Sequence, residues 1–135
     1  MEKAKGRILC VDDDEDACET MNALLDLQGY EVIQAQNVAE GLNQGISNNL
    51  DLILLDWAYQ DGTGIELCKM LRSTGVSAPI LFYSGISDGA DIARAMRAGA
   101  QGFLIKPVDS AELFDSLSRF LGHPGINIER SSEAT

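Results

Sequence analysis

The stretch that decides the fold is LDLILLD, residues 50–56, in which apolar side chains run without alternation between two aspartates. A strand with one face in water alternates apolar and polar residues, whereas a strand covered on both faces is apolar throughout. Residues 50–56 are therefore predicted to form an inner strand of a parallel sheet. Asp56 would end this strand, directly before Trp57, and place a carboxylate at an apolar rim.

Further short apolar runs alternate with segments of helical period on both sides of this strand. They predict strands at 7–11, 31–34, 79–84 and within GFLIKP, 102–107. Five strands alternating with five helices are typical of an α/β fold with one parallel sheet covered on both faces.

The second and fifth helices carry the most specific expectations. The second should begin after Asn37 and turn Val38, Leu42 and Ile46 inward, although its two glycines each cost about 1 kcal/mol relative to alanine. The fifth should be capped by Asp109, with Glu112 three residues later. Its inward side chains would be Leu113, Leu117, Phe120 and Leu121.

Composition excludes several classes of protein. The net charge of −11 argues against binding to nucleic acid or anionic lipid. No apolar run approaches the roughly 20 residues that span a bilayer, and no signal peptide is recognisable, so we expect a cytoplasmic protein. Cys10, Cys18 and Cys68 form no CxxC pair and are predicted to be buried thiols. Residues 1–122 should form the domain, and 123–135 a flexible tail or the start of a linker.

Polar residues stand where the predicted strands end. Asp12 and Asp13 follow the first strand, Asp56 the third, Ser84 the fourth and Lys106 the fifth. The carboxyl ends of parallel strands form one edge, where ligands bind. At 4 Å two carboxylates repel by about 1 kcal/mol in water and about 4 kcal/mol at a dielectric near 20, so a hard divalent cation such as Mg²⁺ is the natural compensation.

Each of these residues also has a plainer reading. An acidic strand-to-helix junction is usually a capping device, and Asp14, Glu15 and Asp16 suit the first turn of a helix. Ser84-Gly85 and Lys106-Pro107 are ordinary turn pairs. The functional interpretation therefore depends on all five polar residues falling at one edge together.

Five short motifs occur in order: VDDD at 11–14, LLDW at 54–57, IEL at 65–67, YSG at 83–85 and GFLIKP at 102–107. In these motifs the chain, from about Arg7 to Leu121, resembles the receiver domain of two-component response regulators. The resemblance implies a flavodoxin-like (βα)5 fold, doubly wound, with strand order 2-1-3-4-5. It also implies a signalling domain rather than an enzyme, limited to self-catalysed phosphoryl transfer and slow autodephosphorylation.

The resemblance further implies that Asp56 accepts a phosphoryl group from a sensor histidine kinase or a histidine phosphotransfer protein. Asp12, Asp13, Asp56 and the backbone carbonyl of Ala58 would hold Mg²⁺, or Mn²⁺ in its place. This ligand set agrees with the electrostatic argument made from the residues alone.

Lys106 and Ser84 would contact the phosphoryl oxygens, and Pro107 would follow a cis peptide. Ser84 and Phe103 would be the switch residues. The signal would pass to an output partner, to a C-terminal effector domain, or to a second copy of the chain in a phosphorylation-dependent homodimer.

Three positions depart from the family pattern. Gln60 stands where many receivers have proline, which puts the loop that presents the Ala58 carbonyl in question. Thr63 replaces a common aspartate, and Phe103 lacks the hydroxyl of the more usual tyrosine.

Two other classes of function fit the sequence less well. A haloacid dehalogenase-type phosphatase would use Asp12 as its nucleophile, but it would leave Asp56 without a role. A flavodoxin-like cofactor binder would need Ser, Thr and Gly amides after the first strand, where this chain has the acidic run DDDED.

Overall fold

The computed structural model describes residues 5–85, 88–106 and 109–121. Five parallel strands form one sheet in the order β2-β1-β3-β6-β7. Counted among themselves along the chain, these five strands have the expected order 2-1-3-4-5, with the predicted inner strand at the centre. Their bounds are β1 Arg7–Val11, β2 Glu31–Ala35, β3 Leu52–Leu55, β6 Ile80–Ser84 and β7 Gly102–Ile105.

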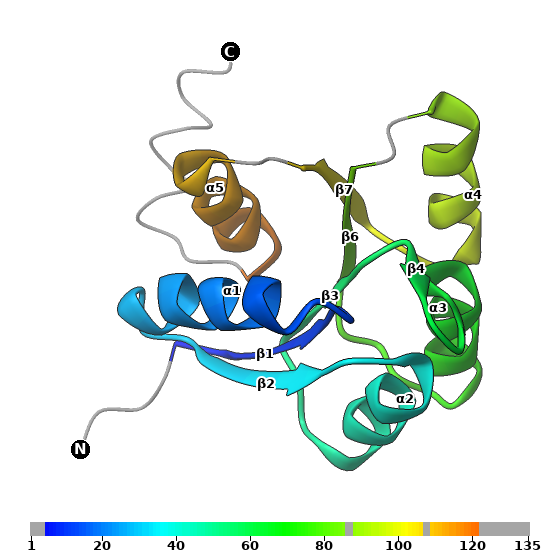
Figure 1. Cartoon of the computed structure of the whole chain (residues 1–135), viewed down its shortest axis with the longest axis horizontal. Coiled ribbons are helices and arrows are strands. Elements are labelled where there is room, and N and C mark those ends of the chain that lie inside the picture. The colour runs from blue at the N-terminus through cyan, green and yellow to red at the C-terminus, as the bar shows by residue number, and fades with distance from the viewer. Residues whose placement is uncertain (1–4, 86–87, 107–108, 122–135) are drawn as a thin grey trace.

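Helices cover both faces of the sheet (Figure 1). Helices α1, Glu15–Leu27, and α5, Ser110–Leu121, pack on one face, and α2, Val38–Ser47, α3, Gly64–Ser73, and α4, Gly89–Ala98, pack on the other. Each face has its own apolar cluster, and the β3 side chains are at most 1% exposed. The predicted doubly wound α/β fold is confirmed.

The inward face of α2 differs from the prediction. Ile46 is 55% exposed, while the buried positions of the helix are Val38 and the two glycines, Gly41 and Gly45. A Cβ atom on Gly41 would lie 2.8 Å from Cδ2 of Leu67 on α3. The glycines therefore let α2 approach α3 closely. The buried side of the helix passes through Gly41 and Gly45, and Ile46 lies about 100° round the helix from Gly45, on the exposed side.

The helix starts follow the expected capping chemistry. Asp14 caps α1, and its side chain accepts the N–H of Asp16 at 3.0 Å. The Asp109 carboxylate accepts the N–H of Glu112 at 2.7 Å at the start of α5. Thr63 forms a capping box with Glu66 at the start of α3, so threonine does here the capping work of an aspartate.

A small hairpin after β3 was not predicted. Strands β4, Ala58–Tyr59, and β5, Gly62–Thr63, pair antiparallel between β3 and α3.

The three cysteines are free and buried, as expected. Within the described ranges, no helix combines the length and apolar character needed to cross a membrane. Pro107 and the predicted tail at 123–135 lie outside the described residues.

Candidate functional site

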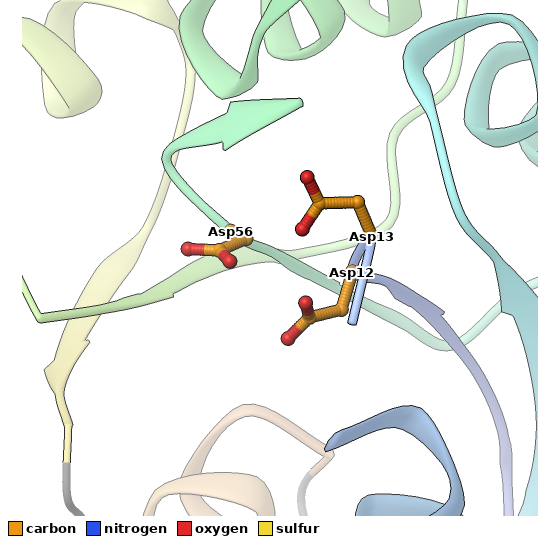
Figure 2. A group of neighbouring side chains, drawn as sticks. All are labelled: Asp12, Asp13 and Asp56. Carbon is orange, nitrogen blue, oxygen red and sulfur yellow. The ribbon is translucent and has the colours of Figure 1, made fainter. Parts of the chain in front are cut away.

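The site is formed where the two central strands end side by side. Val11 is the last residue of β1 and is paired with Leu55, the last residue of β3. Asp12 and Asp13 therefore leave the sheet beside Asp56, and ligand oxygens of the three carboxylates lie within 4.8 Å of one another. Figure 2 shows the three side chains turned towards a common space.

One ammonium serves this acidic group. Lys106, directly after β7, places Nζ 3.4 Å from Oδ2 of Asp12 and 3.5 Å from Oδ2 of Asp56. The same Nζ lies 4.9 Å from the centre of the Tyr83 ring. Among the described residues, no other cation forms an ion pair with the three aspartates. The group of three carboxylates therefore contains one ammonium, which pairs with Asp12 and Asp56 but not with Asp13.

Backbone groups orient two of the carboxylates. Asp12 is 4% exposed, and its Oδ1 accepts the N–H of Asp14 at 3.0 Å. Oδ1 of Asp56 accepts the N–H of Trp57 at 2.7 Å. Burial raises the pKa of Asp56 above its ordinary value, although the Trp57 N–H and the charge of Lys106 oppose the shift. For Lys106, burial favours a lower pKa, but the charges of Asp56 and Asp12 outweigh it and raise the pKa.

The donor set fits a small hard cation. All three side chains offer oxygen, without the histidine or cysteine that softer metals select. Opposite ligands of an octahedral Mg²⁺ are about 4 Å apart, close to the spread of these oxygens. Three carboxylates leave room for water and a phosphoryl oxygen, which suits Mg²⁺ better than the fuller cage of Ca²⁺.

The remaining predicted residues lie around this centre. Ser84 ends β6, is 2% exposed, and its carbonyl accepts the N–H of Lys106 at 2.8 Å. Phe103 on β7 stacks on Phe82, with ring centres 5.9 Å apart, and lies 6.0 Å from the ring of Trp57. Ala58 begins β4, two residues after Asp56.

The loop after β3 holds two residues that sequence reasoning missed. The Tyr59 hydroxyl donates to the carbonyl of Val11 at 2.9 Å and accepts the N–H of Asp56 at 2.7 Å. Asp61 accepts the N–H groups of Val38 and Ala39 at the start of α2, at 2.8 and 3.1 Å, and these bonds lower its pKa. The loop is therefore pinned on both sides without proline at position 60.

Part of this arrangement had a signal in the sequence. Asp61-Gly62 is a turn pair that favours a hairpin, and it could have indicated β4 and β5. Tyr59 had no such signal, because nothing in a single sequence distinguishes a loop tyrosine that bonds to strand ends from one in solvent.

Comparison with known proteins places the chain. The family model described as the response regulator receiver domain matches residues 8–118. The transcriptional regulatory protein ZraR of Klebsiella oxytoca is 35% identical over 120 residues, covering 89% of this chain and 27% of ZraR. The response regulator MprA of Mycobacterium sp. (strain KMS) is 35% identical over 115 residues, covering 85% of this chain and 50% of MprA. The chain thus spans between about a quarter and a half of these relatives.

Solved structures agree with this placement. A two-component response regulator from Clostridium difficile superposes with a TM-score of 0.82 at 31% identity, covering 87% of this chain and 96% of that one. A CheY-like receiver domain protein from Methanospirillum hungatei JF-1 gives a TM-score of 0.83 at 26% identity, covering 95% and 99%. The chain belongs to the response regulator receiver domain family of two-component signalling.

Proposed function

We propose that this chain is a phosphorylation switch in which Asp56 accepts a phosphoryl group from the phosphohistidine of a sensor kinase or phosphotransfer protein. The observation that carries the proposal is the charge imbalance at the carboxyl edge of the sheet, where three carboxylates gather around one ammonium that pairs with only two of them, Asp12 and Asp56. Such a group is costly in a purely structural role, and it is suited to a cation and a transferable anion.

In the proposed reaction, a carboxylate oxygen of Asp56 attacks the phosphorus. The new O–P bond forms as the P–N bond of the phosphohistidine breaks, and the departing imidazole takes a proton from solvent. The Trp57 N–H holds one Asp56 oxygen, and the Lys106 ammonium stands 3.5 Å from the other, ready to contact a phosphoryl oxygen. Ser84 would bind a second phosphoryl oxygen. Phosphoryl transfer needs mainly positioning and charge stabilisation, and these residues supply both.

Asp12, Asp13, Asp56 and the Ala58 carbonyl are proposed to hold Mg²⁺, with Mn²⁺ as a substitute. When bound, the ion would neutralise negative charge on the carboxylates and the incoming phosphoryl group. Support comes from the all-oxygen donor set and from the β4–β5 hairpin, in which Ala58 is paired with Thr63 two residues after Asp56.

The switch is proposed to work through Ser84 and Phe103. Movement of Ser84 towards a phosphoryl group would leave space into which the Phe103 ring can turn, and this ring already touches Trp57 beside the acceptor. The affected surface includes Met96 on α4 and Ile105 on β7, which are 39% and 44% exposed. Apolar side chains exposed there suit an output partner, an effector domain or a second copy.

Trp57 gives a direct test, because it is the only tryptophan and adjoins Asp56. We expect its fluorescence to change with Mg²⁺, and to change again when acetyl phosphate or phosphoramidate is added. The change caused by the phosphodonor should occur only when Mg²⁺ is present. An emission that stays constant through both additions would contradict the proposed site.

The phosphatase alternative, with Asp12 as nucleophile, receives no support from the receiver-family match over residues 8–118. Its remaining test is steady hydrolysis of a phosphate monoester that survives Asp56→Asn. We expect no such turnover.

A further inference from the structure

Tyr59 is hydrogen-bonded to the backbone of the site but is not one of the proposed metal ligands. Its side chain is 7% exposed, and its ring belongs to the apolar cluster shared with α2, α3 and α4. Its hydroxyl is nevertheless directed at the sheet edge, where it bonds to the carbonyl of Val11 and the N–H of Asp56. The hydroxyl thus acts as a donor to one strand end and as an acceptor at the other.

The two bonded groups are the last backbone groups before the acidic side chains. Val11 directly precedes Asp12, and the N–H belongs to Asp56 itself. A direct bond from Asp56 N to Val11 O also exists, but it is long, at 3.2 Å, whereas the bonds through the hydroxyl measure 2.7 and 2.9 Å. The hydroxyl therefore reinforces the β1–β3 ladder at its final rung.

The hydrogen bonds that join Val11 to Asp56 must resist the mutual repulsion of the carboxylates. Asp12, Asp13 and Asp56 leave the two strand ends within ligand distance of one another, and their charges push the ends apart when no metal is bound. If these hydrogen bonds were weakened, the carboxylates would move apart. Part of the binding free energy of a cation would then be used to bring them together again.

From this geometry, and resting on the proposed function above, we propose that the Tyr59 hydroxyl is a positioning group for the metal and phosphoacceptor centre. It sets the separation between the Asp12–Asp13 pair and Asp56, and so controls Mg²⁺ affinity without touching the ion. A role limited to packing would be filled equally well by phenylalanine, because the ring makes the apolar contacts and a buried hydroxyl costs free energy to desolvate.

The test is Tyr59→Phe, which removes one oxygen and leaves the ring. The dissociation constant for Mg²⁺, measured by Trp57 fluorescence, should rise about three- to tenfold, the scale of one net hydrogen bond. The increase in Tm on adding a fixed Mg²⁺ concentration should shrink in parallel. Replacing Tyr59 with p-aminophenylalanine, which restores a donor at the same position, should recover part of the affinity.

Tyr30→Phe is the matched control, since Tyr30 is 6% exposed and belongs to the cluster on the opposite face of the sheet. It should leave Mg²⁺ affinity unchanged, whatever it does to the metal-free Tm. Tyr59→Phe behaving in the same way would overturn the positioning role and leave the proposed function standing. A wild-type chain with no response to Mg²⁺ would instead overturn the metal site itself.

Discussion

Two aspartates flank the same buried strand, and they have opposite surroundings. Asp51, just before β3, is exposed, and its Oδ2 accepts the backbone N–H of Arg7 on the neighbouring strand at 2.8 Å. Asp56, just after β3, faces two further carboxylates and shares the ammonium of Lys106 with Asp12. Asp51 satisfies a backbone donor, whereas Asp56 belongs to a group of side chains with a net negative charge.

The direction of the strands explains the contrast. In a parallel sheet covered by helices, each helix begins near the carboxyl end of a strand, so the positive ends of helix dipoles gather at that edge. α1 begins at Glu15, three residues after Asp12. The positive helix ends favour carboxylates and phosphate at this edge, and the carboxylates can in turn hold a cation. The opposite edge has ordinary strand termini.

The largest effect is expected from removing the acceptor. Asp56→Asn should abolish the gain of one phosphoryl group on incubation with acetyl phosphate and Mg²⁺, because the amide is not a nucleophile for this transfer. Intact-mass spectrometry at neutral pH measures the gain directly. Asp51→Asn, at the other end of the strand, should incorporate phosphate as the wild type does, and undiminished labelling of Asp56→Asn would reject the assignment.

Asp13→Asn should move metal affinity and stability in opposite directions. Asp13 is exposed, and its substitution removes one of three like charges, so the metal-free chain should gain about 1 kcal/mol in free energy of unfolding. Mg²⁺ affinity should fall at least about tenfold, because a charged ligand of a divalent ion is lost. Urea denaturation with and without Mg²⁺ gives both quantities.

The control is Asp16→Asn in the first turn of α1, which removes a favourable charge from the helix start. It should lower stability slightly and leave Mg²⁺ affinity unchanged. Equal behaviour of the two variants would mean that Asp13 is only a helix-start acid.

The contrast between the two ends of β3 was partly visible in the sequence. LILL is apolar without alternation because helices cover both faces, so the apolar run alone was enough to place position 56 at a rim. The convergence of Asp12, Asp13 and Asp56 followed from strand direction and is found in the structure. Their roles as ligands and acceptor stay predictions.

Other features depended on contacts that no local pattern encodes. Gly41 and Gly45 were interpreted as helix-weakening residues, but they mark the close approach of α2 to α3, and Ile46 is exposed because it lies off the side of the helix that they define. Two-residue strands such as β4 and β5 are too short to show periodicity. The hydroxyl of Tyr59 acquires its partners only when β1 and β3 lie side by side.

Lys106→Met tests the shared ammonium. Mg²⁺ should bind about two- to fivefold more tightly, because a competing positive charge is removed from Asp12 and Asp56. Phosphoryl uptake at saturating Mg²⁺ should nevertheless become slower, since the transferring group loses its cationic contact. Lys69→Met, on the exposed side of α3, should change neither value. Weaker Mg²⁺ binding by Lys106→Met would show that the ammonium supports the site rather than competes for it.

The smallest effect is expected from Glu31→Gln, at the edge of the sheet where the parallel strands begin. The Arg7 Nε to Glu31 Oε1 pair measures 3.1 Å, and its side chains are 38% and 51% exposed. Water screens such a pair, so its loss should lower the free energy of unfolding by less than about 1 kcal/mol, and by less still in high salt. Urea denaturation at two NaCl concentrations measures the change.

The same variant also tests whether the two edges are electrically independent. Glu31 lies about five residues of strand, roughly 16 Å, from the carboxyl edge, which exceeds the Debye length of about 8–10 Å at physiological ionic strength. Mg²⁺ affinity should therefore be unchanged in Glu31→Gln. A change in Mg²⁺ affinity comparable to that of Asp13→Asn would mean that the site responds to the net charge of the whole chain. The three carboxylates would then not be the specific determinants of metal binding.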